Sequence, residues 1–425
     1  MSYALYRAAT GAISPLLPAY LHWRLRQGKE DGARLGERLG HASLARPEGA
    51  LLWLHAASVG EAVALLPLME TLRGRYPPLH LLLTTGTVSS ARLMRERLPS
   101  GVLHQFVPVD SPQAVGRFLR HWRPNIGLWV ESELWPNLVI GAHRQGCRMA
   151  LANGRMSAHS FRRWARAPRV MRRMLRCFSF IAAQSEADAE RFRQLGGAAE
   201  ALGNLKYDAA TLTADAEVLT RFAARIEGRA VWLAASTHDD EEERVAEAHT
   251  MLRKEFPALL TLIAPRHPQR AEAIARQLAA RGVRVQRRTQ TAEIGADAEI
   301  YIADTLGEMG MWYRLSRIAF IGGSLIPHGG QNPLEAARLS CAILFGPHME
   351  NFAEIAAGLE AAGAALRVRD GGALASEVGR LLHDVSVRSG LGMRARIWAG
   401  GKTGANAQLV ARLAPLIEET LHAHA

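Results

Sequence analysis

Short apolar runs alternate with longer amphipathic runs along most of the chain. The apolar runs have the length of buried strands, and the runs between them carry apolar residues at helical spacing. In the first half we predict strands at 51–56, 80–84, 102–107, 126–130, 148–152 and 178–183, and helices at 61–75, 89–98, 112–122, 134–144 and 186–195. Repeated β-α units of this kind predict a mainly parallel sheet with helices on both faces.

The pattern pauses near residues 207–215 and then starts again. In the second half we predict strands at 231–235, 259–264, 284–286, 299–303, 318–321, 342–345 and 365–368, and helical runs such as 241–255 and 333–339. Helical sequence from Leu374 onward closes the chain, and its last helix can pack on either half. Because 425 residues are too many for one ordinary core, we predict an α/β protein with two doubly wound, Rossmann-like domains, 27–210 and 211–425, facing each other across a cleft.

The first 26 residues depart from this pattern. Residues 3–21 are mostly apolar but contain Arg7 and two prolines, and no signal-peptide cleavage site follows. The segment is marginal as a bilayer span, which needs about 20 apolar residues. We predict a membrane anchor or an interfacial helix over 1–26, with a helix packed on the domain as the alternative. Trp23 and the arginines beside it favour a body on the cytoplasmic side.

Composition narrows the class of protein. The chain is 48% hydrophobic and 22% charged, as in a soluble globular body. Its net charge of +12 favours anionic partners such as phosphates, nucleic acid or acidic lipid. The three cysteines (Cys147, Cys177 and Cys341) lack CxxC spacing, which argues against a disulfide framework or a zinc cluster and favours a reduced, cytosolic body. We interpret the acidic run 239–243 as a solvated first helical turn and predict no metal site.

Ser58-Val59-Gly60-Glu61 joins the first predicted strand to the first predicted helix. Open α/β sheets bind ligands at such junctions, and the free N–H groups of a helix start favour negative charge. Glu61 is therefore a candidate base. The alternative is structural, because Ser58 and Glu61 have the spacing of a capping box. The two roles are compatible, and the pKa of Glu61 depends on the balance of helix dipole and desolvation.

Other polar residues follow predicted strands of the first half and belong to the same edge. Glu131 comes directly after 126–130, so it is a candidate electrostatic partner of Glu61, or each carboxylate raises the pKa of the other. The alternative for Glu131 is capping of the next helix. Similar positions are 84–87 and 153–155.

The second half is richer in groups that bind anions. Ser236 and Thr237 follow one strand, and Arg266, which can pair bidentately with a phosphate, follows the next. Gly323 and Ser324 follow a third strand and lead into a glycine-rich loop. The loop ends at a helix whose first turn holds Glu335, a candidate acceptor for ribose hydroxyls. No G-x-x-x-x-G-K-[ST] motif occurs, and Gly322-Gly323 is not a G-x-G-x-x-G fingerprint, which weakens ATPase and NAD-binding interpretations.

Residues 161–178 contain seven arginines and no acidic residue, interleaved with apolar side chains. A cationic amphipathic surface suits an anionic lipid or a phosphorylated substrate. RNA binding is a weaker alternative, because no nucleic-acid-binding motif accompanies the arginines. The purely structural alternative is a solvated basic helix. The candidate acceptor or membrane contacts are Arg155, Arg162, Arg163 and Arg166.

Taken together, these residues resemble the 3-deoxy-D-manno-octulosonic acid (Kdo) transferases of lipopolysaccharide assembly. The resemblance covers nearly the whole chain. It rests on six ordered motifs, at 55–61, 131–137, 203–208, 265–268, 304–309 and 322–335.

The resemblance implies a GT-B fold and an inverting transfer of Kdo from CMP-Kdo to a hydroxyl of the lipid A precursor, without metal or cofactor. It implies that Glu61 is the general base and that Glu131 and Lys206 stabilise the transition state. It also implies location at the cytoplasmic face of the inner membrane, with a phosphorylated glycolipid as acceptor and no nucleic acid as partner. The implied CMP-binding residues are Pro265, Arg266, Gly307, Glu308, Met309, Asn332, Pro333, Leu334 and Glu335.

Two alternatives stay open at this point. The first is another GT-B enzyme, a transferase or an epimerase, that uses a UDP-sugar. The second is a non-catalytic membrane or RNA adaptor that binds through the arginine-rich segment.

Overall fold

A computed structural model describes all residues except 1, 132, 209, 210, 292 and 425. The chain divides into two compact units, Met1–Ala209 with Lys402–Ala425, and Ala210–Gly401. Residue 210, the last of the predicted N-terminal domain, lies outside the described residues, as does Ser132 of the motif at 131–137.

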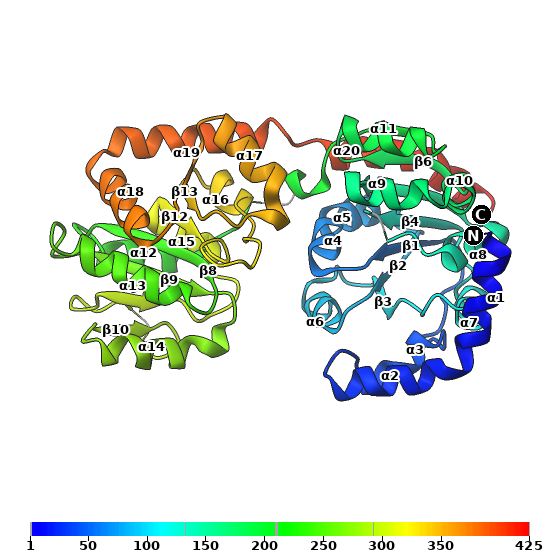
Figure 1. Ribbon diagram of the computed structural model, residues 1–425, viewed down its shortest axis with the longest axis horizontal. Coiled ribbons are helices and arrows are strands. Elements are labelled where there is room, and N and C mark those ends of the chain that lie inside the picture. Colours follow the sequence, from blue (N-terminus) through cyan, green and yellow to red (C-terminus); the bar gives the residue numbers. More distant parts are fainter. Residues whose placement is uncertain (1, 132, 209–210, 292, 425) are drawn as a thin grey trace. The chain divides into compact units, whose positions relative to one another are not determined.

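The N-terminal unit is built on one parallel sheet of seven strands, in the order β3-β2-β1-β4-β5-β6-β7 (Figure 1). The order reverses between β1 and β4, which are hydrogen-bonded neighbours. The strands are β1 (Leu51–Ala56), β2 (His80–Thr85), β3 (Leu103–Phe106), β4 (Ile126–Val130), β5 (Arg148–Gly154), β6 (Phe178–Ala183) and β7 (Ala199–Ala201). The first six were predicted and are confirmed within two residues at each end, whereas β7 was not predicted.

Helices cover both faces of this sheet, and most of those after the strands begin at a serine or threonine whose side chain accepts a backbone N–H. They are α4 (Val59–Ala64), α5 (Leu66–Arg75), α6 (Val88–Arg97), α7 (Pro112–Trp122), α8 (Pro136–Arg144), α9 (Ala158–Ala165), α10 (Pro168–Leu175) and α11 (Glu186–Gln194), with the short 3-10 helix η3 (Leu205–Asp208).

One predicted helix and the arginine-rich run each correspond to two helices in the structure. The helix predicted at 61–75 is α4 followed by α5, with Pro67 in the first turn of α5. The arginine-rich run 161–178 covers the second half of α9 and all of α10, with Pro168 at the start of α10. Proline has no N–H to donate and clashes with the preceding turn, so it begins a helix more readily than it continues one.

The last helix, α20 (Ala405–His422), belongs to the N-terminal unit (Figure 1). Its buried residues Leu409, Leu413 and Ile417 join one of the two apolar clusters of this unit, together with Leu68 and Leu72 of α5. The other cluster lies on α7, α8 and α10 and includes Trp53 and Trp129. Each face of the sheet is therefore closed by an apolar layer, as a parallel sheet requires.

At the N-terminus, α1 (Tyr3–Ile13) runs along one edge of this unit, and after the turn η1 (Ser14–Leu16) the helix α2 (Leu17–Arg26) lies along the adjacent, lower edge (Figure 1). In α1 the Tyr6 hydroxyl donates to Asp110 at 2.8 Å, and Thr10 accepts from Asn137 at 3.0 Å. Thus α1 packs on the domain. No helix among the described residues is long and apolar enough to cross a bilayer, so a membrane-spanning anchor is not confirmed.

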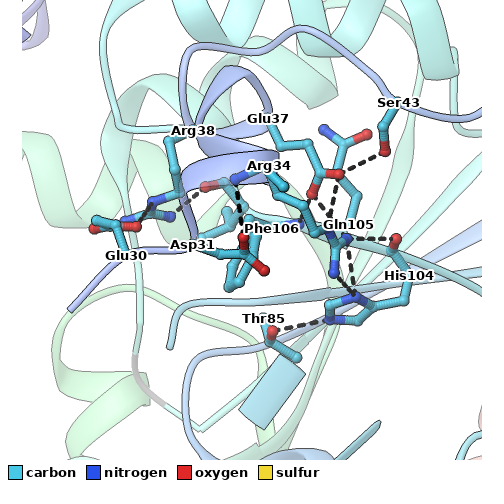
Figure 2. A network of polar contacts seen from close by, with 12 residues as sticks. Glu30, Asp31, Arg34, Glu37, Arg38, Ser43, Thr85, His104, Gln105 and Phe106 are labelled. Atoms are coloured by element: carbon cyan, nitrogen blue, oxygen red, sulfur yellow. Dashed lines mark hydrogen bonds and ion pairs between the residues drawn. The ribbon is translucent and has the colours of Figure 1, made fainter. Parts of the chain in front are cut away.

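The segment after α2 is ordered by buried charges (Figure 2). The Glu37 carboxylate accepts two hydrogen bonds from Arg34 and one, at 2.7 Å, from the Phe106 backbone N–H. Arg34 also contacts His104, whose other ring nitrogen lies 3.0 Å from the Thr85 hydroxyl. Burial lowers the pKa of His104 to about 4, so the ring is neutral and links Arg34 to the end of β2.

The C-terminal unit is a second parallel sheet of seven strands, in the order β10-β11-β9-β8-β12-β13-β14. Its order reverses between β8 and β12. The strands, all predicted, are β8 (Val231–Thr237), β9 (Leu260–Pro265), β10 (Val285–Arg287), β11 (Ile300–Ile302), β12 (Ile318–Ile321), β13 (Ala342–Phe345) and β14 (Ala365–Arg367).

Eight α-helices accompany this sheet among the described residues, and one apolar cluster on α13, α14 and α18 includes Trp232 and Phe320. They are α12 (Ala216–Arg225), α13 (Glu241–Leu252), α14 (Ala271–Ala280), α15 (Met309–Ser316), α16 (Leu334–Arg338), α17 (Ala353–Ala361), α18 (Gly371–His383) and α19 (Val385–Gly400). The predicted α/β class and the two doubly wound sheets are thereby confirmed.

Candidate functional site

Glu61 and Glu131 both lie where the strand order of the N-terminal sheet reverses. Glu61 is in the first turn of α4, directly after β1, and Glu131 directly follows β4. Since β1 and β4 are parallel neighbours, their carboxyl ends lie side by side. This is the position at which doubly wound sheets bind ligands.

The Glu61 carboxylate is buried and held at both oxygens. One oxygen accepts from the Ala57 backbone N–H at 2.8 Å, and the other from the Ser58 hydroxyl at 2.7 Å. Ser58 in turn accepts from the Glu61 N–H at 3.4 Å. The capping arrangement predicted for Ser58 and Glu61 is therefore present, and it fixes the direction of the carboxylate.

Burial is the dominant influence on Glu61 and raises its pKa. The hydrogen bonds from Ser58 and Ala57 lower the pKa, while the nearby negative charges of Glu131 and Glu133 raise it. Desolvation thus outweighs the stabilisation that the helix start provides. A carboxylate with a raised pKa is a better proton acceptor than an exposed one.

Glu131 forms an ion pair with Lys206, at 2.8 Å between the carboxylate oxygen and Nζ. Both side chains are largely buried. The Glu131 backbone is left-handed (φ 59°), and its N–H donates to Ala152 of the neighbouring strand. It does not cap the next helix, because α8 starts at Pro136. The structure thus brings Glu61, Glu131 and Lys206, which are distant in sequence, to one edge.

Lys206 is positioned by amide side chains at the ends of β5 and β6. Asn153 accepts from the Leu205 backbone N–H at 2.9 Å, and its carbonyl accepts from Gln184 at 3.0 Å. Gln184 accepts from Asn204 at 3.2 Å. The sequence analysis included Asn153 among the polar residues that follow strands. It did not single out Gln184, which precedes Ser185, the residue that caps α11.

Asp208 joins this segment to the last helix. Its carboxylate accepts from the backbone N–H groups of Gly404 and Asn406, at the start of α20. Residues 205–208 are therefore fixed from both sides, by strand ends and by the C-terminal helix.

The candidate acceptor contacts are exposed. Arg155 follows β5, Arg162 and Arg163 lie in α9, and Arg166 ends it. In contrast, Thr84 is turned inward to Trp53 and His55, and Thr87 caps α6, so these two have structural roles.

In the C-terminal unit, the groups after β8 and β12 lie at the second reversal of strand order. Glu241, at the start of α13, is fully buried and accepts four backbone N–H groups. Three come from Gly323, Ser324 and Leu325, at 2.6 to 3.0 Å, and one from His238 at 3.0 Å. Burial raises the pKa of Glu241, although these hydrogen bonds lower it. The interpretation of 239–243 as a solvated turn is therefore wrong for Glu241 and for buried Glu242.

This arrangement bears on the expected phosphate contacts. The buried Thr237 hydroxyl donates to Glu242 at 2.8 Å, and the buried Ser324 hydroxyl donates to the Ile321 carbonyl. The N–H groups of Gly323 and Ser324 are occupied by Glu241. The polar groups of Thr237, Gly323 and Ser324 thus have partners inside the fold, and direct phosphate contacts from these three residues stay a prediction. Ser236 alone of the four is partly exposed, with φ 58°.

Imidazole rings occupy the place expected for those contacts. The rings of His238 and His328 are 3.8 Å apart between centroids, and His267 is 6.0 Å from His238. Burial, with the positive charge of His328, His267 and two arginines, lowers the pKa of His238 to about 4. His328 was visible in the glycine-rich loop, but only the fold shows that it meets His238.

The remaining CMP-binding candidates lie on the same edge or at nearby helix starts. Pro265 ends β9, and the exposed Arg266 follows it. Gly307 (φ 85°) and Glu308 precede α15, and Glu308 accepts two hydrogen bonds from Arg288. The Asn332 side chain accepts from the Leu334 N–H at 3.1 Å, just before α16. Met309 lies in the first turn of α15 and Glu335 in the first turn of α16. Pro333 is buried.

Solved structures agree with this architecture. UDP-GlcNAc 2-epimerase from Neisseria meningitidis, bound to UDP-GlcNAc, is 14% identical, covers 86% of this chain and 100% of its own, and has a TM-score of 0.57. MurG from Acinetobacter baumannii is 10% identical, covers 86% and 99%, and has a TM-score of 0.54. At such identities the likeness shows the fold alone. Two doubly wound units with polar groups at both reversal points define a protein of the GT-B fold class.

The sequence comparisons give the family. The model of 3-Deoxy-D-manno-octulosonic-acid transferase (kdotransferase) matches residues 33–209. The probable mitochondrial 3-deoxy-D-manno-octulosonic acid transferase of Arabidopsis thaliana is 38% identical over 85% of this chain and 83% of its own. The 3-deoxy-D-manno-octulosonic acid transferase of Bordetella pertussis is 35% identical over 93% and 96%. The chain belongs to the Kdo transferase family and is a glycosyltransferase.

Proposed function

We propose that this protein transfers Kdo from CMP-Kdo to a hydroxyl of the lipid A precursor, lipid IVA, with inversion at the anomeric carbon. The observation that carries the proposal is the buried, oriented Glu61 carboxylate beside the Glu131–Lys206 ion pair. This combination supplies a proton acceptor and a positive charge at one sheet edge. The proposed reaction uses no metal or cofactor.

In this reaction the acceptor hydroxyl oxygen forms a bond to the anomeric carbon of Kdo. The bond between that carbon and the phosphate oxygen breaks, and its electron pair leaves with CMP. Glu61 takes the hydroxyl proton. The Lys206 ammonium offsets negative charge on the donor carboxylate or the departing phosphate, and Glu131 holds that ammonium in place.

The C-terminal unit is the proposed donor-binding half. Arg266 is exposed and directly follows β9, and its guanidinium suits a phosphate. His238 and His328 lie at the same edge, and we assign them the phosphate contacts first expected of Thr237 and Ser324. Asn332 and Glu335 remain candidates for the ribose and base.

We place the protein at the cytoplasmic face of the inner membrane, where an anionic glycolipid is accessible. Large apolar side chains on α1, η1 and α2 are exposed, in agreement with an interfacial rather than a spanning segment. They are Leu5, Ile13, Leu16, Tyr20 and Trp23. Arg155, Arg162, Arg163 and Arg166 are the proposed contacts to acceptor phosphates or the membrane.

The donor is tested by thermal protection with CMP and with UDP. CMP is expected to raise the melting temperature, and Arg266→Gln is expected to reduce that shift. Arg276→Gln, on the exposed side of α14, is the matched control and should keep it. Protection by UDP but not by CMP would show that the enzyme uses another nucleotide sugar. A transfer assay with CMP-Kdo and lipid IVA, analysed by mass, then identifies the product and the number of Kdo residues added.

A further inference from the structure

Three arginines surround a single tyrosine on the outside of the N-terminal unit. The guanidinium carbons of Arg173 and Arg144 lie 4.9 Å and 5.4 Å from the centre of the Tyr3 ring. Arg7, one helical turn after Tyr3, lines the same cavity. Within the described part of the chain, none of the three arginines forms an ion pair with a carboxylate.

The cavity between them is large and has an apolar lining on one side. Its volume is about 470 Å³, and its other walls are Ala4, Ala8 and Pro112. Asp110 is the acidic group whose charge acts on Tyr3. Its carboxylate already accepts from the Tyr6 hydroxyl and from two backbone N–H groups at the start of α8. Asp110 is thus held by these neutral donors and, among the described residues, forms no ion pair with the three arginines, so one carboxylate stands near three guanidinium groups and the net charge of the cavity is positive.

This cavity is separate from the candidate active site. Arg144 is the last residue of α8, which leads back to the start of β5, and Arg173 is near the end of α10, which leads back to β6. Both lie toward the amino ends of the strands, whereas Glu61 and Glu131 lie at the carboxyl ends.

Charge and apolar surface together indicate the ligand. Guanidinium groups held within about a Debye length of one another repel, and an anion between them relieves the repulsion. Their planar donors match phosphate oxygens. The same helix, α1, and the turn after it expose Leu5, Ile13 and Leu16, which a free inorganic ion would not contact. A ligand with both a phosphate and an apolar chain fits both features.

We propose that the cavity formed by Tyr3, Arg7, Arg144 and Arg173 binds the phosphate of an anionic membrane phospholipid, whose acyl chains lie along the exposed side chains of α1. The inference rests on the proposed location at the membrane surface, but not on the transfer reaction. The bound lipid holds α1 against the bilayer at a defined point, in addition to the general attraction between a basic protein and acidic lipid.

The test uses the full-length protein and vesicles of phosphatidylcholine with or without phosphatidylglycerol. The double variant Arg144→Gln/Arg173→Gln removes two cavity arginines. Arg169→Gln/Arg176→Gln removes the same charge from α10 and its end, at exposed positions that do not line this cavity. Both variants lose the same general attraction to acidic lipid, because each removes two positive charges. The cavity variant also loses the bound phosphate, so we expect its affinity for phosphatidylglycerol vesicles to fall about tenfold further than that of the control. Neither pair should change binding to pure phosphatidylcholine.

Native mass spectrometry gives an independent readout. The wild type and the control pair should retain one phosphatidylglycerol, and the cavity pair should lose it. Equal loss in both pairs would overturn the proposal. Thermal protection of the wild type by inorganic phosphate, with no retained lipid, would assign the cavity to free phosphate instead. A change of oligomeric mass in the cavity pair would assign it to protein contacts.

The melting shift with CMP is measured on the same preparations. The N-terminal unit carries the substituted arginines, so a calorimetric transition of that unit at the wild-type temperature shows that both double variants are folded. Absence of the CMP shift in the wild type contradicts the donor assignment and leaves the lipid result standing, so the two failures are distinguishable.

Discussion

Glu61 has two roles that its surroundings make compatible. As a helix-start residue it accepts hydrogen bonds from Ala57 and Ser58, which favour its charged form. Burial and the nearby charge of Glu131 raise the pKa of Glu61, which favours its neutral form. Burial is the larger influence. At pH values above the folded-state pKa of Glu61, the buried charge therefore lowers the stability of the folded protein.

Glu61→Gln is therefore expected to remove activity without loss of stability at neutral pH. Transfer should fall by about 10²- to 10⁴-fold, the usual contribution of a general base. A raised folded-state pKa gives stability that is present at low pH and lost as the pH rises through it. The melting temperature of the variant relative to wild type should thus increase from acidic to neutral pH.

Initial rates and melting curves across this pH range check both statements. Glu70→Gln, on the exposed side of α5, is the matched control and should change neither quantity. Full transfer activity in the Glu61 variant would contradict the role as base and would assign proton removal to another group.

The sequence allowed the prediction of Glu61, Glu131 and Lys206 together only through family motifs. The strand-end pattern placed Glu61 and Glu131 on one edge, but Lys206 lies in a short turn whose position depends on Asn153 and Gln184. Likewise, five consecutive acidic residues do not reveal which one turns inward. Only the packing of α13 against the loop after β12 shows that it is Glu241.

At the scale of elements, strands were predicted well because each apolar run is buried between two helical layers. β7 was missed because its sequence, Ala199-Glu200-Ala201, is short and half exposed at the sheet edge. The division of the helix predicted at 61–75 was missed because apolar spacing continues across Pro67.

Glu241 fixes the backbone of the loop after β12, because its carboxylate accepts three backbone N–H groups of that loop. Glu241→Gln keeps the shape but replaces one acceptor oxygen by an amide donor, which faces backbone N–H groups. We expect a loss of about 2–4 kcal/mol, as unpaired buried donors cost about 1–3 kcal/mol each, together with weaker protection by CMP. Urea unfolding followed by tryptophan fluorescence measures the first, and the melting shift measures the second.

Glu243→Gln is the control, since Glu243 is in the same turn but its carboxylate contacts Gln277 and Arg281 at the surface. It should leave both CMP protection and unfolding nearly unchanged. Unchanged CMP protection in the Glu241 variant would show that the loop does not take part in donor binding.

At the scale of the whole molecule, the chain leaves the N-terminal unit and later returns to it. The sequence predicted two similar halves, but it did not decide which half receives the last helix, because an apolar stripe fits any apolar face. The structure places α20 on the N-terminal sheet, with Asp208 at its start.

Leu413→Ala, in the buried face of α20, should destabilise the N-terminal unit alone. Removing a fully buried leucine costs about 2–5 kcal/mol, and Leu413 is 0% exposed. In scanning calorimetry we expect one transition to shift to lower temperature, while the transition raised by CMP stays in place. Arg412→Ala, on the exposed face of the same helix, is the control. A downward shift of the CMP-sensitive transition would contradict the assignment of α20.

The place of α20 also bears on how the chain folds during synthesis. Residues of the C-terminal unit form one continuous stretch, so that unit can close its core as soon as it has emerged from the ribosome. The N-terminal unit is made earlier but lacks Leu409, Leu413 and Ile417 until after that point. During that time the apolar face around Leu68 and Leu72 is not covered by α20. A chaperone that binds exposed apolar surface on the nascent chain would therefore bind this face.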